Sequence, residues 1–300
     1  MREFPDYSKI IVQPLNSSEF IFSSLKVDML RLDLLHDEIS GNKWFKLKYN
    51  LEQAQKEKKD TILTFGGAWS NHIVATAAAC DLLGFKSIGI IRGEELNEDS
   101  SPSLILARGH NMQLYFVSRE LYGEKEDPGF IDYLNKEFYQ PYIIPEGGNN
   151  DLGIKGCKEI LSFCEQEKYT HICCAVGAGA TLTGLIESAS MNLRLLGFSA
   201  LRNADYLKNK IEKSLTGYGE NISWKLITDY HFGGFAKKTP ELLEFMRDFY
   251  EKNKIVLDFV YTAKMMFGIN DLIKKEYFSS GSRILAIHTG GLQGNKSLTV

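Results

Sequence analysis

A lysine at the predicted start of a helix is the first residue of this chain that could do chemistry. Lys43 lies in the segment SGNKWF (residues 40–45), after a turn-forming Gly-Asn pair and before two aromatic residues. A helix N-terminus and burial against aromatic rings both disfavour an ammonium. Lys43 therefore either extends to water, as Lys46 and Lys48 are expected to do on a solvated helix face, or is an amine kept for chemistry.

A glycine-rich stretch, VGAGATLTG (residues 176–184), could bind a compact anion. It has no Walker lysine, and Leu182 stands where a dinucleotide-binding motif has its third glycine. The stretch is either an ordinary strand-to-helix turn or a nest for one anion such as a phosphate ester. The backbone amides that would form the nest belong to Gly177, Ala178, Gly179, Ala180 and Thr181.

A second glycine-rich segment, FGGAWSNH (residues 65–72), places Ser70, Asn71 and His72 at a predicted helix start. Ser or Asn at this position can simply cap the helix. Alternatively, the hydroxyl, the side-chain amide and the free backbone amides hold a carboxylate and a phenolic oxygen. His72 is more typical of a packed or capping histidine than of a base, and no nucleophile elbow indicates a hydrolase.

Two further segments near the C-terminus carry hydroxyl groups. Tyr261 and Thr262 directly precede a predicted helix, and Thr289 follows the last predicted strand in the sequence HTGG. Tyr261 taken alone could be a core aromatic residue. A threonine hydroxyl can hydrogen-bond an unprotonated pyridine nitrogen, whereas a carboxylate would hold that nitrogen protonated, so the residue type here sets how strongly such a ring withdraws electrons.

The elements that must position these residues alternate between short apolar strands and amphipathic helices, which indicates an α/β fold with largely parallel sheets. Three predicted strands run directly into glycine-rich turns, GGAWSN, GAGAT and TGG. Because open α/β sheets bind ligands at the carboxyl ends of their strands, we expect one shared pocket. The predicted strands are 61–65, 87–91, 114–117, 142–145, 171–176, 193–199, 224–228 and 283–288.

The composition argues against several other classes of protein. The chain has 300 residues, 44% of them hydrophobic, and a net charge of -3, so it can form two domains but offers no basic surface for nucleic acid or an anionic membrane. No apolar stretch approaches the roughly 20 residues that span a bilayer, and the N-terminal segment lacks an apolar signal region, so we expect a cytoplasmic protein. The five cysteines have no metal-ligand spacing, and we expect neither a metal nor disulfides.

Taken in order, these motifs resemble the 1-aminocyclopropane-1-carboxylate deaminase/D-cysteine desulfhydrase family, pyridoxal-phosphate enzymes of the tryptophan synthase β-like fold. The matching pieces cover nearly the whole chain: GNKWFKLKYNL, TFGGAWSNH, IPEGGNNDLGIKG, VGAGATLTG, DFVYTAK and HTGG. The resemblance implies two open, largely parallel twisted sheets with flanking helices. It also implies a smaller domain at 46–145, a larger cofactor-binding domain from 1–45 and 146–300, and the cofactor between them.

The resemblance further implies how pyridoxal 5'-phosphate would be held. Lys43 would be the amine that forms the Schiff base, and it would act as a base once substrate displaces it. Asn71 would bond the phenolic oxygen of the cofactor, and residues 177–181 would hold its phosphate. Thr289 would face the pyridine nitrogen, with Thr262 nearby.

The substrate side of the site follows from the same resemblance. Ser70, with its neighbours Asn71 and His72, would grip the substrate carboxylate. Tyr261 would assist the departing group during β-elimination. The partner implied is a small amino acid, and because relatives of this fold are commonly dimers we expect a homodimer.

Two departures from the family pattern bear on the substrate. The deaminases carry a glutamate after the tyrosine of the DxVY motif, where this chain has Thr262, as desulfhydrase-type members do. The deaminases also use a second tyrosine in a loop that corresponds to FGGFAKK, where this chain has Phe235. Because cyclopropane opening has no Cα proton to start from and needs help at the ring carbons, both departures argue against it.

The sequence therefore predicts a D-cysteine desulfhydrase, which would convert D-cysteine to pyruvate, sulfide and ammonia. Deamination of 1-aminocyclopropane-1-carboxylate is the alternative within the family, and a non-catalytic pyridoxal-phosphate-binding protein is the alternative of another class. His231 is expected to be a loop histidine and Glu146 a turn residue.

Overall fold

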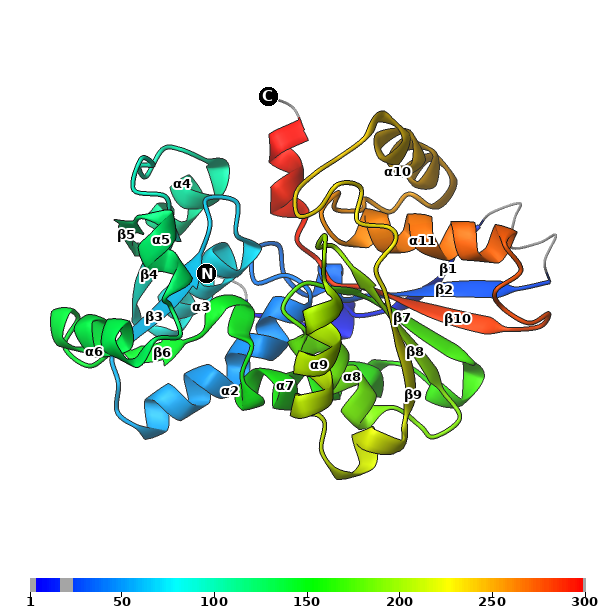
Figure 1. The fold of residues 1–300 in the computed structure, drawn as a ribbon, viewed down its shortest axis with the longest axis horizontal. Coiled ribbons are helices and arrows are strands. Elements are labelled where there is room, and N and C mark those ends of the chain that lie inside the picture. The colour runs from blue at the N-terminus through cyan, green and yellow to red at the C-terminus, as the bar shows by residue number, and fades with distance from the viewer. Residues whose placement is uncertain (1–3, 17–23, 299–300) are drawn as a thin grey trace.

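The computed structural model describes residues 4–16 and 24–298 and contains two open sheets side by side, each flanked by helices (Figure 1). The larger sheet has the strand order β1-β2-β10-β7-β8-β9, and the smaller has the order β5-β4-β3-β6. Among these strands β1 is antiparallel to β2, and every other neighbouring pair is parallel. The strands are β1 (Val12–Pro14), β2 (Lys26–Arg31), β3 (Thr61–Gly66), β4 (Lys86–Arg92), β5 (Gln113–Val117), β6 (Tyr142–Ile144), β7 (His171–Val176), β8 (Arg194–Ser199), β9 (Ser223–Ile227) and β10 (Arg283–His288).

The helices cover both faces of each sheet, as parallel sheets require (Figure 1). In the described ranges the α-helices are α2 (Asn42–Lys56), α3 (Asn71–Leu83), α4 (Pro102–Gly109), α5 (Arg119–Gly123), α6 (Pro128–Glu137), α7 (Asp151–Cys157), α8 (Ala180–Ser188), α9 (Asp205–Ser214), α10 (Pro240–Asn253) and α11 (Thr262–Lys274). The 3-10 helices that matter below are η3 (Glu146–Gly148) and η7 (Leu292–Leu298). None of the helices in these ranges is long and apolar enough to cross a membrane.

The predicted α/β class, with two largely parallel sheets, is confirmed. All eight predicted strands are present, and β7 and β10 have the predicted bounds. β1 and β2 were not predicted, because β2 reads KVDMLR, in which Asp28 divides a short apolar run that Lys26 and Arg31 flank. The first residues of the N-terminal segment, 1–3, lie outside the described ranges.

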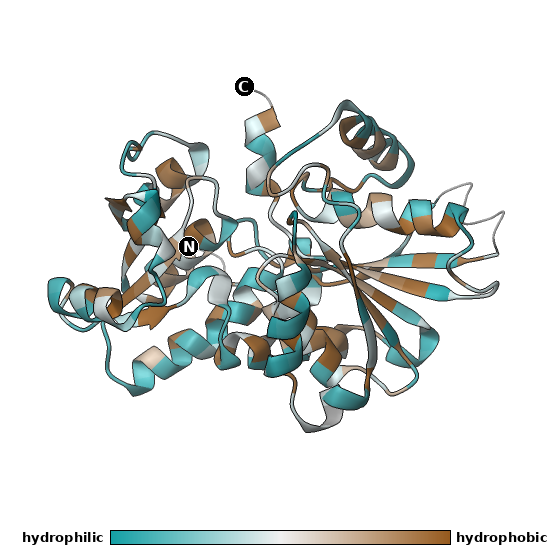
Figure 2. Cartoon of the chain, in the orientation of Figure 1, coloured by the Kyte–Doolittle hydropathy of each residue, from teal (hydrophilic) through white to brown (hydrophobic). Residues whose placement is uncertain are grey.

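The core joins the two sheets through α2. One cluster of buried apolar side chains contains Leu195 of β8, Phe45 of α2 and Ile62 of β3. The hydropathy colouring shows the same arrangement, with apolar residues along the strands and on the inner faces of the helices (Figure 2). We keep the predicted domain boundaries, a smaller domain at 46–145 within a larger one, as a proposal.

Candidate active site

The turn before α2 packs against the turn that follows β10. Gly41 has φ 63°, and a Cβ there would lie 2.0 Å from the carbonyl oxygen of Thr289, so this position requires glycine. The backbone amide of Asn42 donates a hydrogen bond to the same carbonyl oxygen, with an N···O distance of 3.3 Å. The start of α2, which carries Lys43, is thereby fixed next to Thr289.

The Lys43 amine lies in a small polar network at the start of α2. Its Nζ donates to Asn42 Oδ1 (2.8 Å), and Asn42 Nδ2 donates to Thr181 Oγ1 (2.8 Å), which links α2 to the start of α8. Burial, together with the nearby Lys46 charge, lowers the pKa of Lys43 to about 7. Of the two alternatives for Lys43, the structure favours the desolvated amine, a large share of which is neutral and nucleophilic at pH 7.

The prediction that Lys46 lies on a solvated helix face is wrong. Lys46 is only 5% exposed, because α2 packs against α7 so closely that a Cβ at Gly156 would lie 1.7 Å from the Phe45 carbonyl oxygen. Burial lowers the pKa of Lys46, and no carboxylate of the described residues forms an ion pair with it. Lys48 is half-buried and pairs with Glu159. A half-buried amine (Lys43) and a buried one (Lys46), one helical turn apart, therefore lie at the start of α2.

The start of α3 gathers donors that suit a carboxylate. Ser70 caps the helix, its Oγ accepting a hydrogen bond from the amide of Ile73 (3.3 Å). Asn71 Nδ2 donates to the Gly291 carbonyl oxygen (3.2 Å), whereas the buried Asn71 Oδ1 has no partner within the described chain. The backbone amides of Asn71 and His72 begin the helix and so have no intrahelical acceptor. One hydroxyl and these amides are therefore available to an anion.

The His72 side chain plays a different part from its backbone. Its Nε2 lies 2.9 Å from Thr64 Oγ1, whose own proton goes to the Ile144 carbonyl oxygen. We therefore assign the proton to Nε2, which leaves the buried Nδ1 as an acceptor without a partner in the described residues. Burial and the charges of Lys43 and Lys46 lower the pKa of His72 to about 3. A neutral imidazole with a bare Nδ1 does not attract a carboxylate, so only the backbone amide of His72 can contribute there.

The start of α8 forms the glycine-rich turn predicted for residues 177–181. Gly179 has φ 106°, a conformation that side-chain-bearing residues rarely adopt. At Gly177 a Cβ would lie 3.1 Å from the Tyr261 ring and hydroxyl, so glycine lets this turn approach the tyrosine. The amide of Ala180 donates to Asn149 Oδ1 (3.0 Å). The turn keeps the other amides of a nest and lies against Tyr261.

Tyr261 lies directly before α11 with its ring against the Gly177 turn. Its hydroxyl has no hydrogen-bond partner within the described chain, and burial raises its pKa, with smaller contributions from Asp258 and Glu146. The hydroxyl therefore stays protonated at neutral pH and can donate a proton.

Asp258 is a residue of the site that the sequence analysis missed. Its Oδ1 accepts hydrogen bonds from the amides of Tyr261 (2.6 Å) and Thr262 (3.0 Å), and its Oδ2 is buried without a partner among the described residues. The Thr262 hydroxyl bonds the Asp258 backbone, accepting from its amide at 2.8 Å. Thr262 thus uses its hydroxyl to hold the start of α11. An Asp three to four residues ahead of the first helical amides is the signal that could have identified this cap.

We expect Asp258→Ala to lower the free energy of unfolding by about 1–2 kcal/mol, the usual cost of losing a cap. Asp258→Asn keeps the Oδ1 acceptor and removes the charge. Burial raises the pKa of Asp258 to about 6 in the folded protein, so ionisation of Asp258 costs stability. The free energy of unfolding of Asp258→Asn should therefore rise relative to that of the natural protein as pH rises through about 6. Urea unfolding at pH 5 and pH 8 measures this; equal destabilisation by Asn and Ala at both pH values would contradict the capping role.

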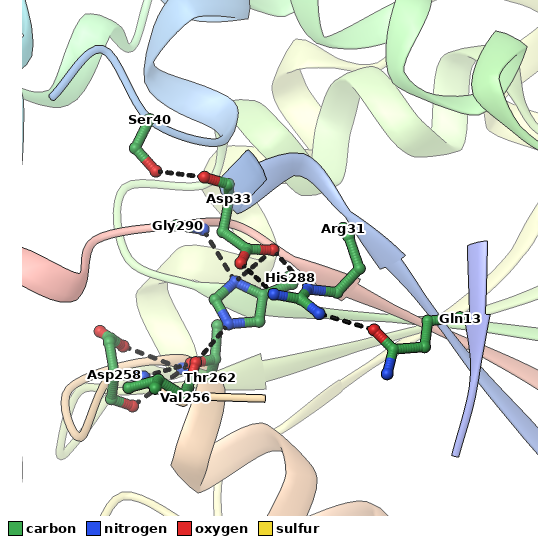
Figure 3. A network of polar contacts seen from close by, with 9 residues as sticks. All are labelled: Gln13, Arg31, Asp33, Ser40, Val256, Asp258, Thr262, His288 and Gly290. Atoms are coloured by element: carbon green, nitrogen blue, oxygen red, sulfur yellow. Dashed lines mark hydrogen bonds and ion pairs between the residues drawn. The ribbon is translucent and has the colours of Figure 1, made fainter. Parts of the chain in front are cut away.

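A buried polar network around His288 supports the turn after β10 (Figure 3). His288 Nε2 donates to the Val256 carbonyl oxygen (2.8 Å), and its Nδ1 accepts from the Gly290 amide (3.2 Å). The Asp33 carboxylate lies 3.4 Å from Nδ1 and is held by two hydrogen bonds from Arg31 at 2.7 and 2.8 Å. These contacts tie β2, β10 and the segment before α11 to one turn.

The Thr289 side chain projects from this supported turn. Thr289 is buried, and its hydroxyl has no partner within the described chain. Because the Thr262 hydroxyl is already bonded to Asp258, Thr289 is the better placed of the two predicted threonines to meet a ligand.

Two residues whose roles the sequence left open make structural contacts at the edge of this cluster. Glu146 accepts a hydrogen bond from the Tyr122 hydroxyl (2.8 Å) beside the smaller sheet. His231 lies in the loop between β9 and α10, where its Nδ1 accepts from the amide of Gly233 (2.9 Å). The structure gives both residues local structural contacts, as expected.

The assembled groups fit one kind of ligand chemistry. A desolvated amine can bind an aldehyde covalently, a glycine-rich helix start can hold a phosphate, and a second helix start can hold a carboxylate. In the described ranges no group of three His, Cys, Asp or Glu side chains could hold a metal ion, and the five cysteines are free thiols. The chemistry available is therefore that of an amine, hydroxyl groups and backbone amides.

Comparison with known proteins defines the class of protein to which this fold and site belong. Residues 9–290 match the family model described as pyridoxal-phosphate dependent enzyme. A crystal structure of O-ureido-L-serine synthase superposes with a TM-score of 0.71 over 97% of this chain and 91% of its own, at 14% identity, and so shows the shared fold. The chain is a pyridoxal-phosphate-dependent enzyme.

Closer relatives narrow this class. The mitochondrial bifunctional D-cysteine desulfhydrase/1-aminocyclopropane-1-carboxylate deaminase of Arabidopsis thaliana is 32% identical over 287 residues, which cover 88% of this chain and 72% of the relative. The crystal structure of a homologue of 1-aminocyclopropane-1-carboxylate deaminase is 28% identical, with a TM-score of 0.82 over 98% of this chain and 92% of its own. The chain belongs to the 1-aminocyclopropane-1-carboxylate deaminase/D-cysteine desulfhydrase family, and its cofactor is pyridoxal phosphate.

Proposed function

We propose that this enzyme catalyses β-elimination from a small amino acid, with D-cysteine and water giving pyruvate, sulfide and ammonia. The observation that carries the proposal is the pairing of Tyr261 with Phe235, whose rings meet edge to face at 6.0 Å. This pairing offers one phenolic hydroxyl, which is enough to assist a departing thiolate. Ring opening of a cyclopropane would draw on a second acidic group that Phe235 cannot supply.

The residues present fit the cofactor. We assign its covalent attachment to the Lys43 amine and its phosphate to the turn at 177–181. The buried Lys46 amine, which lacks an ion-pair partner in the described chain, is a second amine near Lys43. Asn71 would donate the second N–H of its Nδ2, the first of which bonds the Gly291 carbonyl oxygen, to the phenolic oxygen, and Thr289 would meet the ring nitrogen. When bound, the cofactor supplies a conjugated ring that withdraws electrons from the substrate Cα–H bond.

Different residues would then hold the substrate, remove its Cα proton and donate a proton to the departing group. Ser70 and the amides of Asn71 and His72 hold the substrate carboxylate and so orient the amino acid. Lys43, with a pKa near 7, removes the Cα proton. Tyr261, protonated at neutral pH, donates a proton to the departing sulfur. Thr289 has no charge, so it would leave the ring nitrogen unprotonated.

The test is release of 2-oxo acids by the cofactor-loaded protein. D-Cysteine, L-cysteine, D-serine and 1-aminocyclopropane-1-carboxylate are supplied in parallel, and pyruvate and 2-oxobutyrate are measured separately. Pyruvate from D-cysteine, with little 2-oxobutyrate from the cyclopropane substrate, is the expected result. Efficient formation of 2-oxobutyrate would overturn the substrate assignment, and turnover of none of the four would overturn the reaction.

The second candidate is deamination of 1-aminocyclopropane-1-carboxylate, an activity that the names of both relatives include. In that reaction the Tyr261 hydroxyl would polarise the ring. Phe235→Tyr restores a second hydroxyl beside Tyr261 and should raise any 2-oxobutyrate formation. If ring opening is already efficient in the natural protein and Phe235→Tyr does not improve it, our interpretation of Phe235 is wrong.

We expect Lys46→Met to move the pH dependence of Lys43 toward higher pH. The Lys46 charge is the second cause that lowers the Lys43 pKa, so its removal must raise that pKa. Pyridoxal, which has the aldehyde but no phosphate, serves as the probe, and cyanoborohydride trapping at each pH gives the rate of attachment. Lys48→Met removes the amine that pairs with Glu159 and is the matched control. An unchanged midpoint in Lys46→Met would contradict the coupling.

We further propose that the enzyme works in the cytoplasm as a homodimer, without nucleic-acid or membrane partners. The net charge of -3, which offers no basic surface for nucleic acid, supports the absence of nucleic-acid partners. Light scattering of the purified cofactor-loaded protein checks the assembly, and cell fractionation checks the location.

A further inference from the structure

The loop between β9 and α10 contains an unusual run of left-handed residues. Phe232, Gly233, Gly234 and Ala236 have φ values of 51°, 92°, 120° and 54°. For a residue with a side chain this conformation costs about 1–2 kcal/mol. A segment with this backbone needs contacts from outside to hold it in one conformation.

A buried lysine supplies those contacts. Lys264, on the first turn of α11, is 1% exposed, and its Nζ donates to the carbonyl oxygens of His231 (2.9 Å) and Gly234 (2.8 Å). Burial lowers its pKa to about 8, and no carboxylate of the described residues lies within ion-pair distance of it. A buried ammonium is costly, so its two bonds to one loop indicate a role in that loop.

Both bonds fall on carbonyl groups that close turns of the same loop. The Gly234 amide donates to the His231 carbonyl oxygen (3.0 Å), and the Lys237 amide donates to the Gly234 carbonyl oxygen (3.1 Å). The loop also packs against α11 through Phe232, whose ring lies edge to face with the Phe267 ring at a centroid distance of 4.9 Å. Lys264 therefore holds the middle of the loop by hydrogen bonds, while Phe232 packs one end of the loop against α11.

Phe235 lies at the exposed tip of the gripped segment and contacts Tyr261. The two rings meet at an angle of 67°, yet Phe235 remains 47% exposed. The core does not enclose this ring, so the conformation of the loop must determine its position. The contact therefore depends on the hydrogen bonds from Lys264, which lies three residues after Tyr261 on the chain.

We propose that Lys264 is a positioning residue, which clamps the 231–235 loop so that Phe235 packs against Tyr261 and holds its ring in place. The proposal rests on the proposed function for the role of Tyr261 in proton donation. It adds a residue that contacts neither substrate nor cofactor and acts on the reaction through Phe235.

The clamp itself is tested by hydrogen exchange on the cofactor-loaded protein, without substrate. Lys264→Met has a side chain of similar length and no donor, and the amides of Gly234 and Lys237 should exchange at least about 10-fold faster in it. Lys252→Met, an exposed position on α10, is the matched control and should leave this exchange unchanged. Unchanged protection of the loop in Lys264→Met would overturn the clamp.

The link to Tyr261 is tested by kinetics with D-cysteine. Lys264→Met should lower kcat by about 10-fold, as expected for a misplaced catalytic group, while KM changes little. Phe235→Ala should give a similar loss, and the double variant should be no slower than the slower single variant, because both act through one contact. Additive losses, or full kcat in Phe235→Ala, would overturn the link. If no amino acid is turned over, the proposed function fails, whereas hydrogen exchange still decides the clamp.

Discussion

Replacing Lys43 with alanine is expected to abolish covalent attachment of the cofactor and to lower turnover by about 10³-fold or more. The reason is that one amine is proposed both to bind the aldehyde and to remove the Cα proton. Lys46 also lies at the start of α2, but its side chain is buried and makes no hydrogen bond to Asn42, so we do not expect it to replace Lys43. The amine of Lys43 is set apart by its hydrogen bond to Asn42 and a pKa near 7.

The measurement is borohydride reduction of the loaded protein, followed by mass spectrometry of its peptides. The natural protein should carry the reduced cofactor on the peptide that contains Lys43. Lys43→Ala should carry none, although it can still bind the cofactor without a covalent bond. Lys48→Ala, on the same helix, should label as the natural protein does. Covalent labelling at Lys46 in either protein would contradict the assignment of the amine.

The sequence was sufficient to predict most of the sheet framework for a physical reason. Strands such as β7 and β10 contain unbroken apolar runs, ICCAV and ILAI, because strands buried on both faces admit few polar residues. The glycine-rich turns after them could be recognised because close backbone approach or a positive φ requires glycine, as at Gly290 and Gly179. β2 was missed, since its apolar run is short and is divided by Asp28.

The candidate site shows where sequence reasoning stops. Lys46 was assigned to solvent because lysine is rarely buried, and only the packing of α2 against α7 reveals that this face of α2 is enclosed. Asp258 was overlooked, although its cap of α11 could be read from its spacing. The hydrogen bonds from Lys264 to the loop that contains His231 and Gly234 join residues far apart in the sequence, so no local sequence pattern predicts them.

Replacing Tyr261 with phenylalanine is expected to lower kcat for D-cysteine by about 10²- to 10³-fold, within the usual range for removal of a general acid. The change removes only the hydroxyl, so the ring should keep its contacts with Gly177 and Phe235. Tyr169→Phe is the matched control, because its hydroxyl bonds Asp28 (2.9 Å) and is assigned no part in the site. Cofactor absorption should match that of the natural protein in both variants, and thermal unfolding should be unchanged in Tyr261→Phe, whose lost hydroxyl has no hydrogen-bond partner in the described chain, which would assign the loss to the reaction.

The size of that loss should depend on the group that departs. A thiolate leaves more readily when Tyr261 protonates it, whereas chloride needs no proton. With β-chloro-D-alanine, therefore, Tyr261→Phe should lose less than about 10-fold in kcat, because the step assisted by the acid no longer needs assistance. Equal losses with both substrates would show that Tyr261 acts before the departing step, through binding or removal of the Cα proton. In that case the proton for sulfur must come from another group, and the Lys43 ammonium, formed when the amine takes up the Cα proton, would be the next candidate.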